Sequence, residues 1–308
     1  MKDENQRFIT NQIINRIEVT IGVCVRNSEK LIGEAIQSII VQDFPHSLME
    51  VIFVDDGSKD RTLSVIDGYL LKLNMQSRMF HHEWKGLAIS RNVVVNNAEG
   101  RYIIWVDGDM SLSKDFVAKQ YEFMQKNPEV AIAKGKYGMC PQNSLVADLE
   151  NIEFVVTFSM QRGRLSAVPL GTGGSICRVK AMKQVGGFDE KITGSGEDVD
   201  AESRIKAAGW SLDVTSAIFY ERRRGTWKSL WKEYFWHGQG SPRLFGKGNQ
   251  GVKPYKLWPP IVLAVESFRI VTAYKLTQRK AVLLLPVHYI FKRTAWLLGF
   301  ARTLLSKY

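Results

Sequence analysis

Short apolar runs alternate with segments of helical periodicity through the first half of the chain. Three runs of aliphatic, β-branched and aromatic residues without helical spacing predict buried strands at 17–25, 49–54 and 102–106. Segments with apolar side chains at helical spacing lie at 31–40, 62–73 and 86–97, and Met79 and Phe80 are predicted as a short extra strand. This alternation, in units of about 30 residues, predicts an α/β fold with a mostly parallel sheet flanked by helices.

Acidic residues follow two of the predicted strands at the point where each strand ends. Asp107 and Asp109 come directly after the third run, and Asp55 and Asp56 come directly after the second. Ligands of open α/β sheets bind at the carboxyl ends of the strands, where two carboxylates can hold a divalent cation and phosphate oxygens. A carboxylate of the second run can accept hydrogen bonds from a base or a ribose. Asp-Gly-Asp alone is more often an acidic turn, so this interpretation depends on other motifs.

The second half of the chain adds a glycine-rich stretch and an acidic helix start. Gly173 and Gly174 belong to Gly-Thr-Gly-Gly-Ser at 171–175, which either lets backbone approach a ligand closely or forms a plain flexible turn. A helix is predicted to begin at Glu197 and Asp198, with acids in its first turn. Such acids usually serve only as caps and partners of the helix dipole, so each motif alone carries little weight.

Composition limits the classes of protein that are possible. The chain has 308 residues, of which 45% are hydrophobic and 24% charged, so it can bury a full α/β core and a further element. Its formal charge of +11 indicates an anionic partner of one of three classes: a nucleotide, a nucleic acid or a membrane surface. Three widely spaced cysteines without a Cys-x-x-Cys pair predict reduced core residues of a cytosolic protein. No P-loop or dinucleotide glycine motif follows a predicted strand.

We divide the chain into a polar leader without an apolar signal region (1–16), a catalytic domain (17–225) and a basic, aromatic C-terminal region (226–308). Aromatic and basic residues alternate at 227–237, which favours core packing and a membrane-facing or acceptor-facing surface about equally. The Gly-rich, Pro-rich and basic stretch 238–256 is predicted as a linker.

Two apolar segments follow this linker, at 257–274 and 281–305. Charged residues interrupt both, so neither offers the roughly 20 uninterrupted apolar residues that a transmembrane helix requires. We therefore predict amphipathic helices that lie in a membrane interface, with tryptophan and tyrosine at headgroup level.

Five motifs, in this order and spacing, resemble the family 2 glycosyltransferases with the GT-A fold, and the resemblance covers roughly residues 17–224. They are Asp55-Asp56-Gly57-Ser58 with Asp60, Ser90-Arg91-Asn92, Asp107-Gly108-Asp109, Gly186-Gly187-Phe188-Asp189 and Gly196-Glu197-Asp198. The resemblance implies a Rossmann-like GT-A sheet and a nucleoside-diphosphate sugar as donor.

The resemblance also implies roles for the residues that would bind the donor. Asp55 or Asp56 would contact the nucleoside, and Arg91 would lie near the nucleotide or sugar phosphate. Asp107 and Asp109 would bind Mn²⁺ or Mg²⁺ together with the donor diphosphate.

On the acceptor side, the resemblance implies that Asp198 is the general base, with Glu197 as the competing assignment. Many relatives carry a histidine shortly after the last core strand that completes the metal shell. Here that place holds Glu221, which would substitute as a ligand unless water fills the position. Arg222, Arg223 and Arg224 follow it, and one or more of them are candidates for guiding an anionic acceptor headgroup toward the donor.

Together these expectations describe an inverting transferase that moves a sugar from a nucleoside diphosphate to a polyprenyl phosphate or a lipid-linked glycan, at the cytosolic face of the cell membrane. A divalent cation neutralises the leaving group, and a carboxylate base favours single displacement. One alternative is the same enzyme with a soluble saccharide or protein acceptor. Another is a non-catalytic protein that binds nucleotide sugars. A nucleic-acid-binding protein is disfavoured because it leaves the ordered acidic motifs unexplained.

Overall fold

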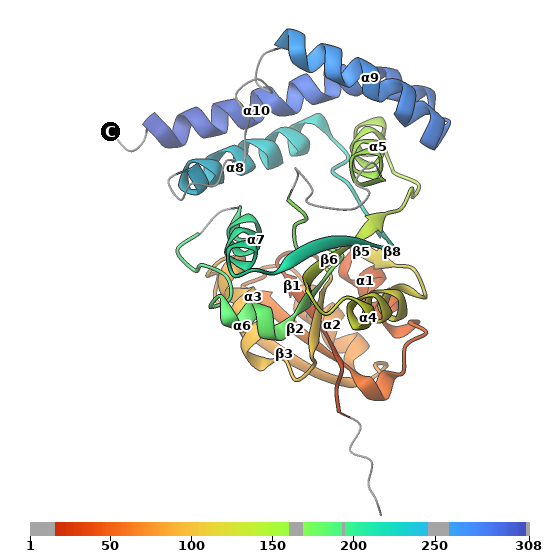
Figure 1. Ribbon diagram of the computed structural model, residues 1–308, viewed down its shortest axis with the longest axis vertical. Helices are drawn as coiled ribbons and strands as arrows, with labels where there is room; N and C mark the ends of the chain where they lie inside the picture. The colour runs from red at the N-terminus through yellow and green to blue at the C-terminus, as the bar shows by residue number, and fades with distance from the viewer. Residues whose placement is uncertain (1–15, 160–168, 193–194, 246–258, 306–308) are drawn as a thin grey trace, which may run out of the picture.

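The computed structural model describes residues 16–159, 169–192, 195–245 and 259–305, and all structural statements below concern these residues. Their strands form one eight-stranded mixed sheet with the order β3-β2-β1-β4-β7-β6-β8-β5. Helices cover both faces of this sheet, and helices from the last third of the chain form a further layer above it (Figure 1). The predicted mostly parallel sheet flanked by helices is confirmed.

The first half of the chain forms the parallel part of the sheet. Its strands are β1 (Val19–Val25), β2 (Met49–Asp56), β3 (Gln76–His82) and β4 (Tyr102–Trp105), and its helices are α1 (Ile32–Ile40), the short η1 (His46–Leu48), α2 (Thr62–Leu70) and α3 (Leu87–Asn97). β2 includes Asp55 and Asp56 as its last two residues. β3 is longer than predicted because it lies at the edge of the sheet, where polar side chains replace an apolar run.

The second half of the sheet brings antiparallel strands next to β4. Its strands are β5 (Met110–Leu112), β6 (Val130–Tyr137), β7 (Ser175–Arg178) and β8 (Ser211–Glu221), and its helices are α4 (Phe116–Lys126), α5 (Leu145–Ser159), α6 (Val179–Gln184) and α7 (Glu197–Ala207). β7 pairs antiparallel with β4 and β6, and β5 pairs antiparallel with β8. Met110 lies opposite Glu221 in that last pair, so Asp109 and Glu221 come close although 112 positions separate them.

An apolar cluster lies on each face of the sheet, because alternate residues of a strand point to opposite sides. Ile104 of β4 joins the cluster beneath α1, α2 and α4, whereas Trp105 joins the cluster beneath α3, α6 and α7. Gly22 of β1 makes room for that indole ring, since a Cβ there would lie 2.9 Å from it. Cys24 and Cys177 are free and buried in this second cluster, while Cys140 is free and half-buried.

The C-terminal region contains α8 (Trp227–Phe245), α9 (Pro259–Thr277), the short η3 (Lys280–Leu284) and α10 (Leu285–Leu305). The predicted linker is therefore wrong for 238–245, which continue α8, while 246–258 lie outside the described residues. Glycines here serve close helix packing. A Cβ at Gly238 would lie 2.0 Å from the carbonyl oxygen of Trp296, and a Cβ at Gly299 would lie 2.0 Å from that of Phe235.

The aromatic residues of α8 divide between two environments. Leu230 is buried, and Trp227 and Trp231 pack edge-on against Phe291 of α10. Trp236, in contrast, is 44% exposed. Core packing therefore accounts for part of the stripe at 227–237, and Trp236 leaves an aromatic ring available on another face of the helix.

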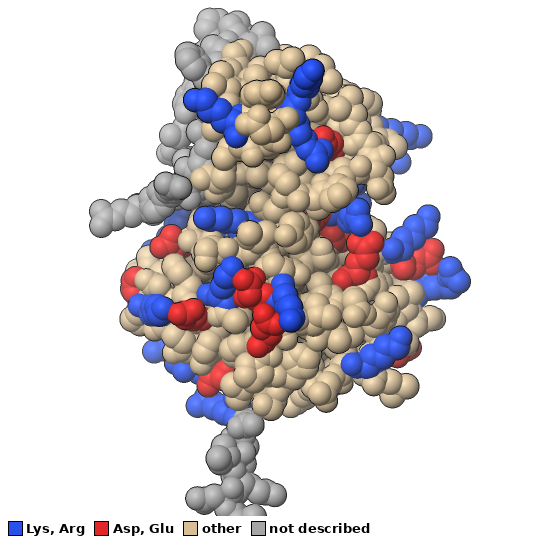
Figure 2. All heavy atoms as spheres, turned by 90° about the vertical axis from the view of Figure 1, so that its right-hand side faces the viewer, with Lys and Arg blue, Asp and Glu red and all other residues tan. Residues whose placement is uncertain are grey.

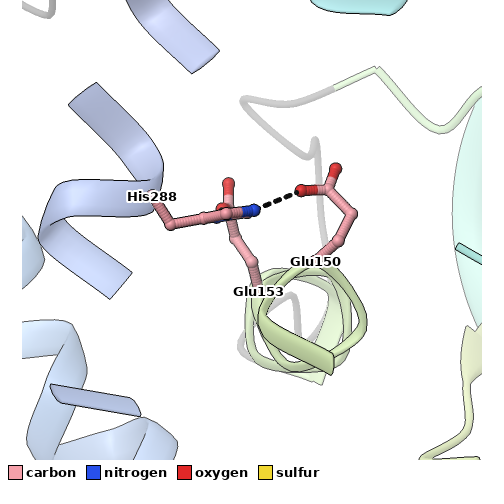
Figure 3. Close-up of side chains that lie close together, drawn as sticks. All are labelled: Glu150, Glu153 and His288. Carbon is pink, nitrogen blue, oxygen red and sulfur yellow. Dashed lines mark ion pairs between the residues drawn. The ribbon is translucent and has the colours of Figure 1, made fainter. Parts of the chain in front are cut away.

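A buried ion-pair network, which we call the α5/α10 network, joins the C-terminal helices to α5 (Figure 3). Glu150 and Glu153 of α5 both accept hydrogen bonds from the Lys292 ammonium of α10, at 2.8 and 2.6 Å. His288 lies 3.1 Å from Glu150 and 3.3 Å from Glu153. Tyr234 of α8 donates to Glu150 at 2.6 Å, so three helices meet at one carboxylate.

The ligand atoms of Glu150, Glu153 and His288 lie within 4.8 Å of one another, a spacing that a metal ion could also use. Lys292 supplies the positive charge instead. Burial raises the pKa of Glu150, but Lys292 and His288 more than offset this and lower it to about 2. Burial lowers the pKa of His288, but the two glutamates more than offset this, so its pKa is raised. We interpret the network as a structural contact that stabilises the packing of α8 and α10 on α5.

By length and composition alone, residues 280–305 of η3 and α10 pass as a segment able to cross a membrane. The sequence analysis excluded a spanning helix here because charged residues interrupt the segment. The mean hydropathy of the segment is nevertheless high enough, because its apolar residues outweigh these charges. Lys292, one of these charges, is buried against α5. The same test is also passed by core helices of soluble proteins, so it does not distinguish a spanning helix from one lying on a surface.

Replacing Lys292 by methionine should lower the free energy of unfolding by about 3 kcal/mol or more, because two buried carboxylates lose their cation. Lys275→Met on α9 is the control: this lysine is exposed, and its removal should change the stability by no more than about 0.5 kcal/mol. Urea unfolding followed by circular dichroism measures both values. Equal stabilities of the two variants would contradict this structural role.

Candidate functional site

A cavity of about 980 Å³ opens at the carboxyl ends of β1, β2 and β4. This volume is at the upper end of what ligand pockets usually provide. Its floor is formed by the loops that follow those strands, and its opposite wall is α8. Five of the residues predicted from the sequence line this cavity: Asp56, Arg91, Asp107, Asp109 and Glu221.

The two acids at the end of β2 have different surroundings. Asp56 lines the cavity and accepts hydrogen bonds from the backbone N–H groups of Lys85 and Gly86, at 2.8 and 3.1 Å. Asp55 is fully buried and holds the backbone N–H of Ser58 at 3.0 Å and the His81 ring at 2.9 Å. Both carboxylates thus shape the loops around the β2 end of the cavity, and of the two Asp56 is the one that a ligand can reach.

Three carboxylates crowd together where β5 pairs with β8. Burial raises the pKa of Asp109, and the neighbouring Asp107 raises it further, to about 6. Burial also raises the pKa of Glu221 to about 8, with Arg223 opposing and Asp109 adding to the rise. Raised values mean that negative charge here is incompletely neutralised by the protein. Oxygen ligands with unbalanced charge suit a divalent cation such as Mn²⁺ or Mg²⁺, so the residues present fit the predicted metal.

Glycine is needed beside these acids. A Cβ on Gly173 would lie 2.6 Å from Oδ2 of Asp107, so the loop approaches the carboxylate more closely than any other residue allows. Gly174 has a different role: its φ is +68°, and a Cβ there would meet the Phe219 ring at 2.4 Å. Packing and a left-handed backbone therefore explain Gly174 without a ligand.

Two buried cations support the acids: the sequence analysis missed Lys134, and it named Arg223 only as a candidate for guiding the acceptor. Lys134 of β6 is 2% exposed and donates to the carbonyl oxygen of Gly173; burial lowers its pKa to about 8, while Glu221 and Asp107 oppose that shift. Arg223 holds Glu221 at 2.6 Å and stacks 3.7 Å above the Phe154 ring. A lysine inside the apolar run 130–134 was the available signal for the first of these.

Arg91 and Glu197 form a buried ion pair at the side of the cavity, and Arg91 also lies 3.9 Å from Asp107. Burial raises the pKa of Glu197 to about 7, with Arg91 opposing the rise. Asp198 is more open. Its Oδ1 accepts from the backbone N–H of Val199 at 2.8 Å, and it lines a small separate cavity with Gly171. The geometry therefore favours Asp198 over Glu197 as a base, and both assignments stay predictions.

The α8 wall carries the last candidate residues. Arg224, just before the helix, lines the cavity and pairs with Glu233 at 3.1 Å. Lys232, Trp236 and His237 line it as well. The predicted Arg222 is not among the described lining residues: it pairs with Glu34 at 3.2 Å and donates to the carbonyl oxygen of Pro141. Of the three predicted arginines, Arg224 is therefore the one that lines the cavity.

A GT-A sheet with paired aspartates at a strand end and a second acid on a later helix defines a glycosyltransferase of the nucleotide-sugar class. The chain belongs to glycosyl transferase family 2, whose family model matches residues 20–183. The related model "Glycosyl transferase family group 2" matches residues 102–305.

Two curated relatives illustrate the range of the family. Poly(ribitol-phosphate) beta-N-acetylglucosaminyltransferase TarS of Staphylococcus aureus is 36% identical over 101 residues, which are 33% of this chain and 18% of that protein. Poly-beta-1,6-N-acetyl-D-glucosamine synthase of Staphylococcus epidermidis is 25% identical over 276 residues, 80% of this chain and 64% of that protein. The match thus spans less than a fifth of the length of TarS.

Solved structures share the fold. The mannosyltransferase PcManGT from Pyrobaculum calidifontis, solved in complex with GDP-Man and Mn²⁺, superposes with a TM-score of 0.65 at 18% identity, over 95% of this chain and 88% of that one. Staphylococcus aureus TarS superposes with a TM-score of 0.51 at 19% identity, over 94% of this chain and 55% of that one. These likenesses show the GT-A-like fold.

Replacing Asp198 and Glu197 one at a time by their amides should separate the roles of these two adjacent acids. Asp198→Asn should keep the stability of the protein but lower transfer to a neutral hydroxyl by a factor on the order of 10². Glu197→Gln should lower the free energy of unfolding by about 2 kcal/mol, because Arg91 then loses its charged partner. Unfolding curves and initial rates of both variants test this. The reverse pattern would make Glu197 the base.

Proposed function

We propose that this chain is a metal-dependent, inverting glycosyltransferase that moves a sugar from a nucleoside diphosphate to a polyprenyl phosphate or another lipid-linked acceptor. The observation that carries the proposal is the crowding of Asp107, Asp109 and Glu221 at one edge of a cavity that also holds Arg91. The names of relatives solved with UDP-GlcNAc and with GDP-Man support a nucleotide-sugar donor.

In this proposal each wall of the cavity has its own task. Asp56 accepts a hydrogen bond from the nucleoside, and Asp107 and Asp109 hold Mn²⁺ or Mg²⁺, with Glu221 as a third oxygen ligand. When bound, the cation neutralises the charge that develops on the leaving diphosphate. Arg91, held in place by Glu197, adds a fixed positive charge next to the same oxygens.

Asp198 acts on the acceptor rather than on the leaving group in this proposal. Its carboxylate takes the proton of an acceptor hydroxyl, which favours direct displacement and inversion of the sugar. An acceptor that is already a phosphate anion needs no base. In that case Asp198 positions the acceptor or stabilises the positive charge that develops on the sugar.

The proposed location is the cytosolic face of a membrane, with α10 lying in the interface. One face of α10 is buried against α8 and α5, while an outward face carries exposed apolar residues at helical spacing: Val287, Ile290, Leu298 and Leu305. Thr294 and Ala301 are also exposed on this face, and apolar patches of this kind mark interaction surfaces. Figure 2 shows that the upper helices present mostly uncharged atoms and a few Lys and Arg side chains, which suits anionic lipid headgroups.

A soluble acceptor is the second candidate, because the names of two relatives refer to a poly(ribitol phosphate) and a poly-N-acetylglucosamine. Both would use the same donor site. Transfer assays with a polyprenyl phosphate and with soluble saccharides separate the two candidates.

Replacing Asp109 by alanine should abolish nucleotide-sugar turnover and the stabilisation by nucleoside diphosphate with Mn²⁺. At 100 times its dissociation constant, a ligand stabilises the folded protein by about 2.7 kcal/mol, which thermal unfolding with UDP or GDP detects. Asp67→Ala, at an exposed acid of α2, is the control and should behave as wild type. Full activity of Asp109→Ala in excess chelator would contradict the metal assignment.

Charge on the outward face of α10 should release the protein from membranes. The double variant Val287→Glu with Leu298→Glu should no longer float with anionic liposomes, whereas wild type floats. Leu71→Glu is the control for an added surface charge, because Leu71 is 97% exposed just after α2, outside the C-terminal helices, and this variant should float. Wild-type protein that stays in the dense fraction would contradict the membrane location and leave the transferase assignment unchanged.

A further inference from the structure

The wall of the cavity formed by α8 has a chemistry of its own. Ser229, Lys232, Glu233, Trp236 and His237 all line the cavity. Their spacing of three and four residues puts them on one face of the helix. This face, which we call the α8 face, lies opposite the carboxyl ends of the strands.

Lys232 is the residue of the α8 face whose charge is available to a ligand. Its side chain is exposed, and no carboxylate of the described residues lies within ion-pair distance of its ammonium. Glu233, in contrast, pairs with Arg224 at 3.1 Å and lies 4.0 Å from His237. The single acid of the α8 face is therefore engaged by its neighbours, and the positive charge of Lys232 remains unbalanced.

The α8 face also lies beside the reacting groups rather than beside the nucleoside end. Arg224, just before the helix, lines the same cavity as Asp107 and Asp109. Gly240, on the next turn of α8, packs against the loop before α7: a Cβ there would lie 2.4 Å from the carbonyl oxygen of Ser195, three residues before Asp198. A ligand that touches the α8 face therefore lies close to the proposed metal ligands and to the proposed base.

The opposite end of the cavity is built differently. There Asp56 and the exposed Trp84 line the wall, and the Arg26 guanidinium lies 5.3 Å from the Trp84 ring centre. The donor nucleoside accounts for that end under the proposed function. The acceptor is the other substrate of a transferase, so the α8 face is left to bind it.

We propose that the α8 face is the acceptor subsite, and that Lys232, with Arg224 beside it, binds a phosphoryl group that the acceptor carries. Trp236, 44% exposed, packs against the apolar or sugar group attached to that phosphate. This inference rests on the proposed transferase function and names the residues that select its acceptor. A cation on this wall also offsets the repulsion between an anionic acceptor and the carboxylates at the strand ends.

The test compares two lysines of the same helix. Lys232→Glu reverses a charge on the α8 face, and Lys228→Glu makes the same change at an exposed lysine one turn earlier that does not line the cavity. The probes are farnesyl phosphate and neutral farnesol in detergent, and soluble glycerol 3-phosphate. Isothermal titration calorimetry, in the presence of Mn²⁺ and UDP or GDP, measures binding without requiring turnover.

Farnesyl phosphate should bind wild type and Lys228→Glu equally, and Lys232→Glu at least about tenfold more weakly, because a charge-assisted contact becomes a repulsion. The affinity for the nucleotide should stay within about twofold in both variants. Trp236→Ala should weaken farnesyl phosphate more than glycerol 3-phosphate if the acceptor is a lipid. Equal losses for the two probes would indicate a soluble phosphorylated acceptor with the same subsite.

Two results would overturn the subsite. One is unchanged binding of farnesyl phosphate and glycerol 3-phosphate to Lys232→Glu, with wild type binding both. The other is a wild-type protein that binds neither phosphate and glycosylates only neutral acceptors. The first leaves the transferase and its lipid acceptor in place, because donor turnover and flotation are measured separately. The second also removes the polyprenyl phosphate from the proposed function.

Discussion

The constraint on which the site depends is the crowding of carboxylates at one end of the sheet. Asp107 raises the pKa of both Asp109 and Glu221, so the charge of these carboxylates has to be balanced from outside the group. Buried cations surround them: Arg91 beside Asp107, and Arg223 in contact with Glu221. Each cation also makes a second contact: Arg91 pairs with Glu197 of α7, and Arg223 stacks on Phe154 of α5. The same cations that balance the charge therefore also hold α7 and α5 in place.

Local patterns were sufficient to predict the parallel half of the sheet. An apolar run followed by acids identifies a strand and its end without any knowledge of its neighbours, as for Asp107 after the run at 102–106. The partners of these acids could not be predicted in this way. Lys134 reaches the site from β6, and Arg223 follows β8. Their proximity to Asp107 arises only when β7 pairs antiparallel with β4 and β6, and β8 pairs parallel with β6.

The error at 238–245 has a physical reason that applies beyond this chain. Glycine is abundant in flexible linkers and also where two backbones must touch, and composition alone does not separate these cases. Gly238 and Gly299 belong to the second case, since each faces a carbonyl oxygen of the partner helix. Likewise Lys292 reads as an interruption of an apolar segment, although its ammonium is buried between two glutamates of α5.

Helix α8 therefore connects the outer helical layer with the cavity. On one side it packs on α10 through Gly238, and Tyr234 ties it to Glu150 of the α5/α10 network. On the other side Gly240 touches the backbone of Ser195, two residues before the first acid of α7. The packing that leaves the apolar stripe of α10 outside thus also fixes the distance between the α8 face and Asp198. An acceptor drawn from a membrane would meet both surfaces in one rigid arrangement, because the same helix borders each of them.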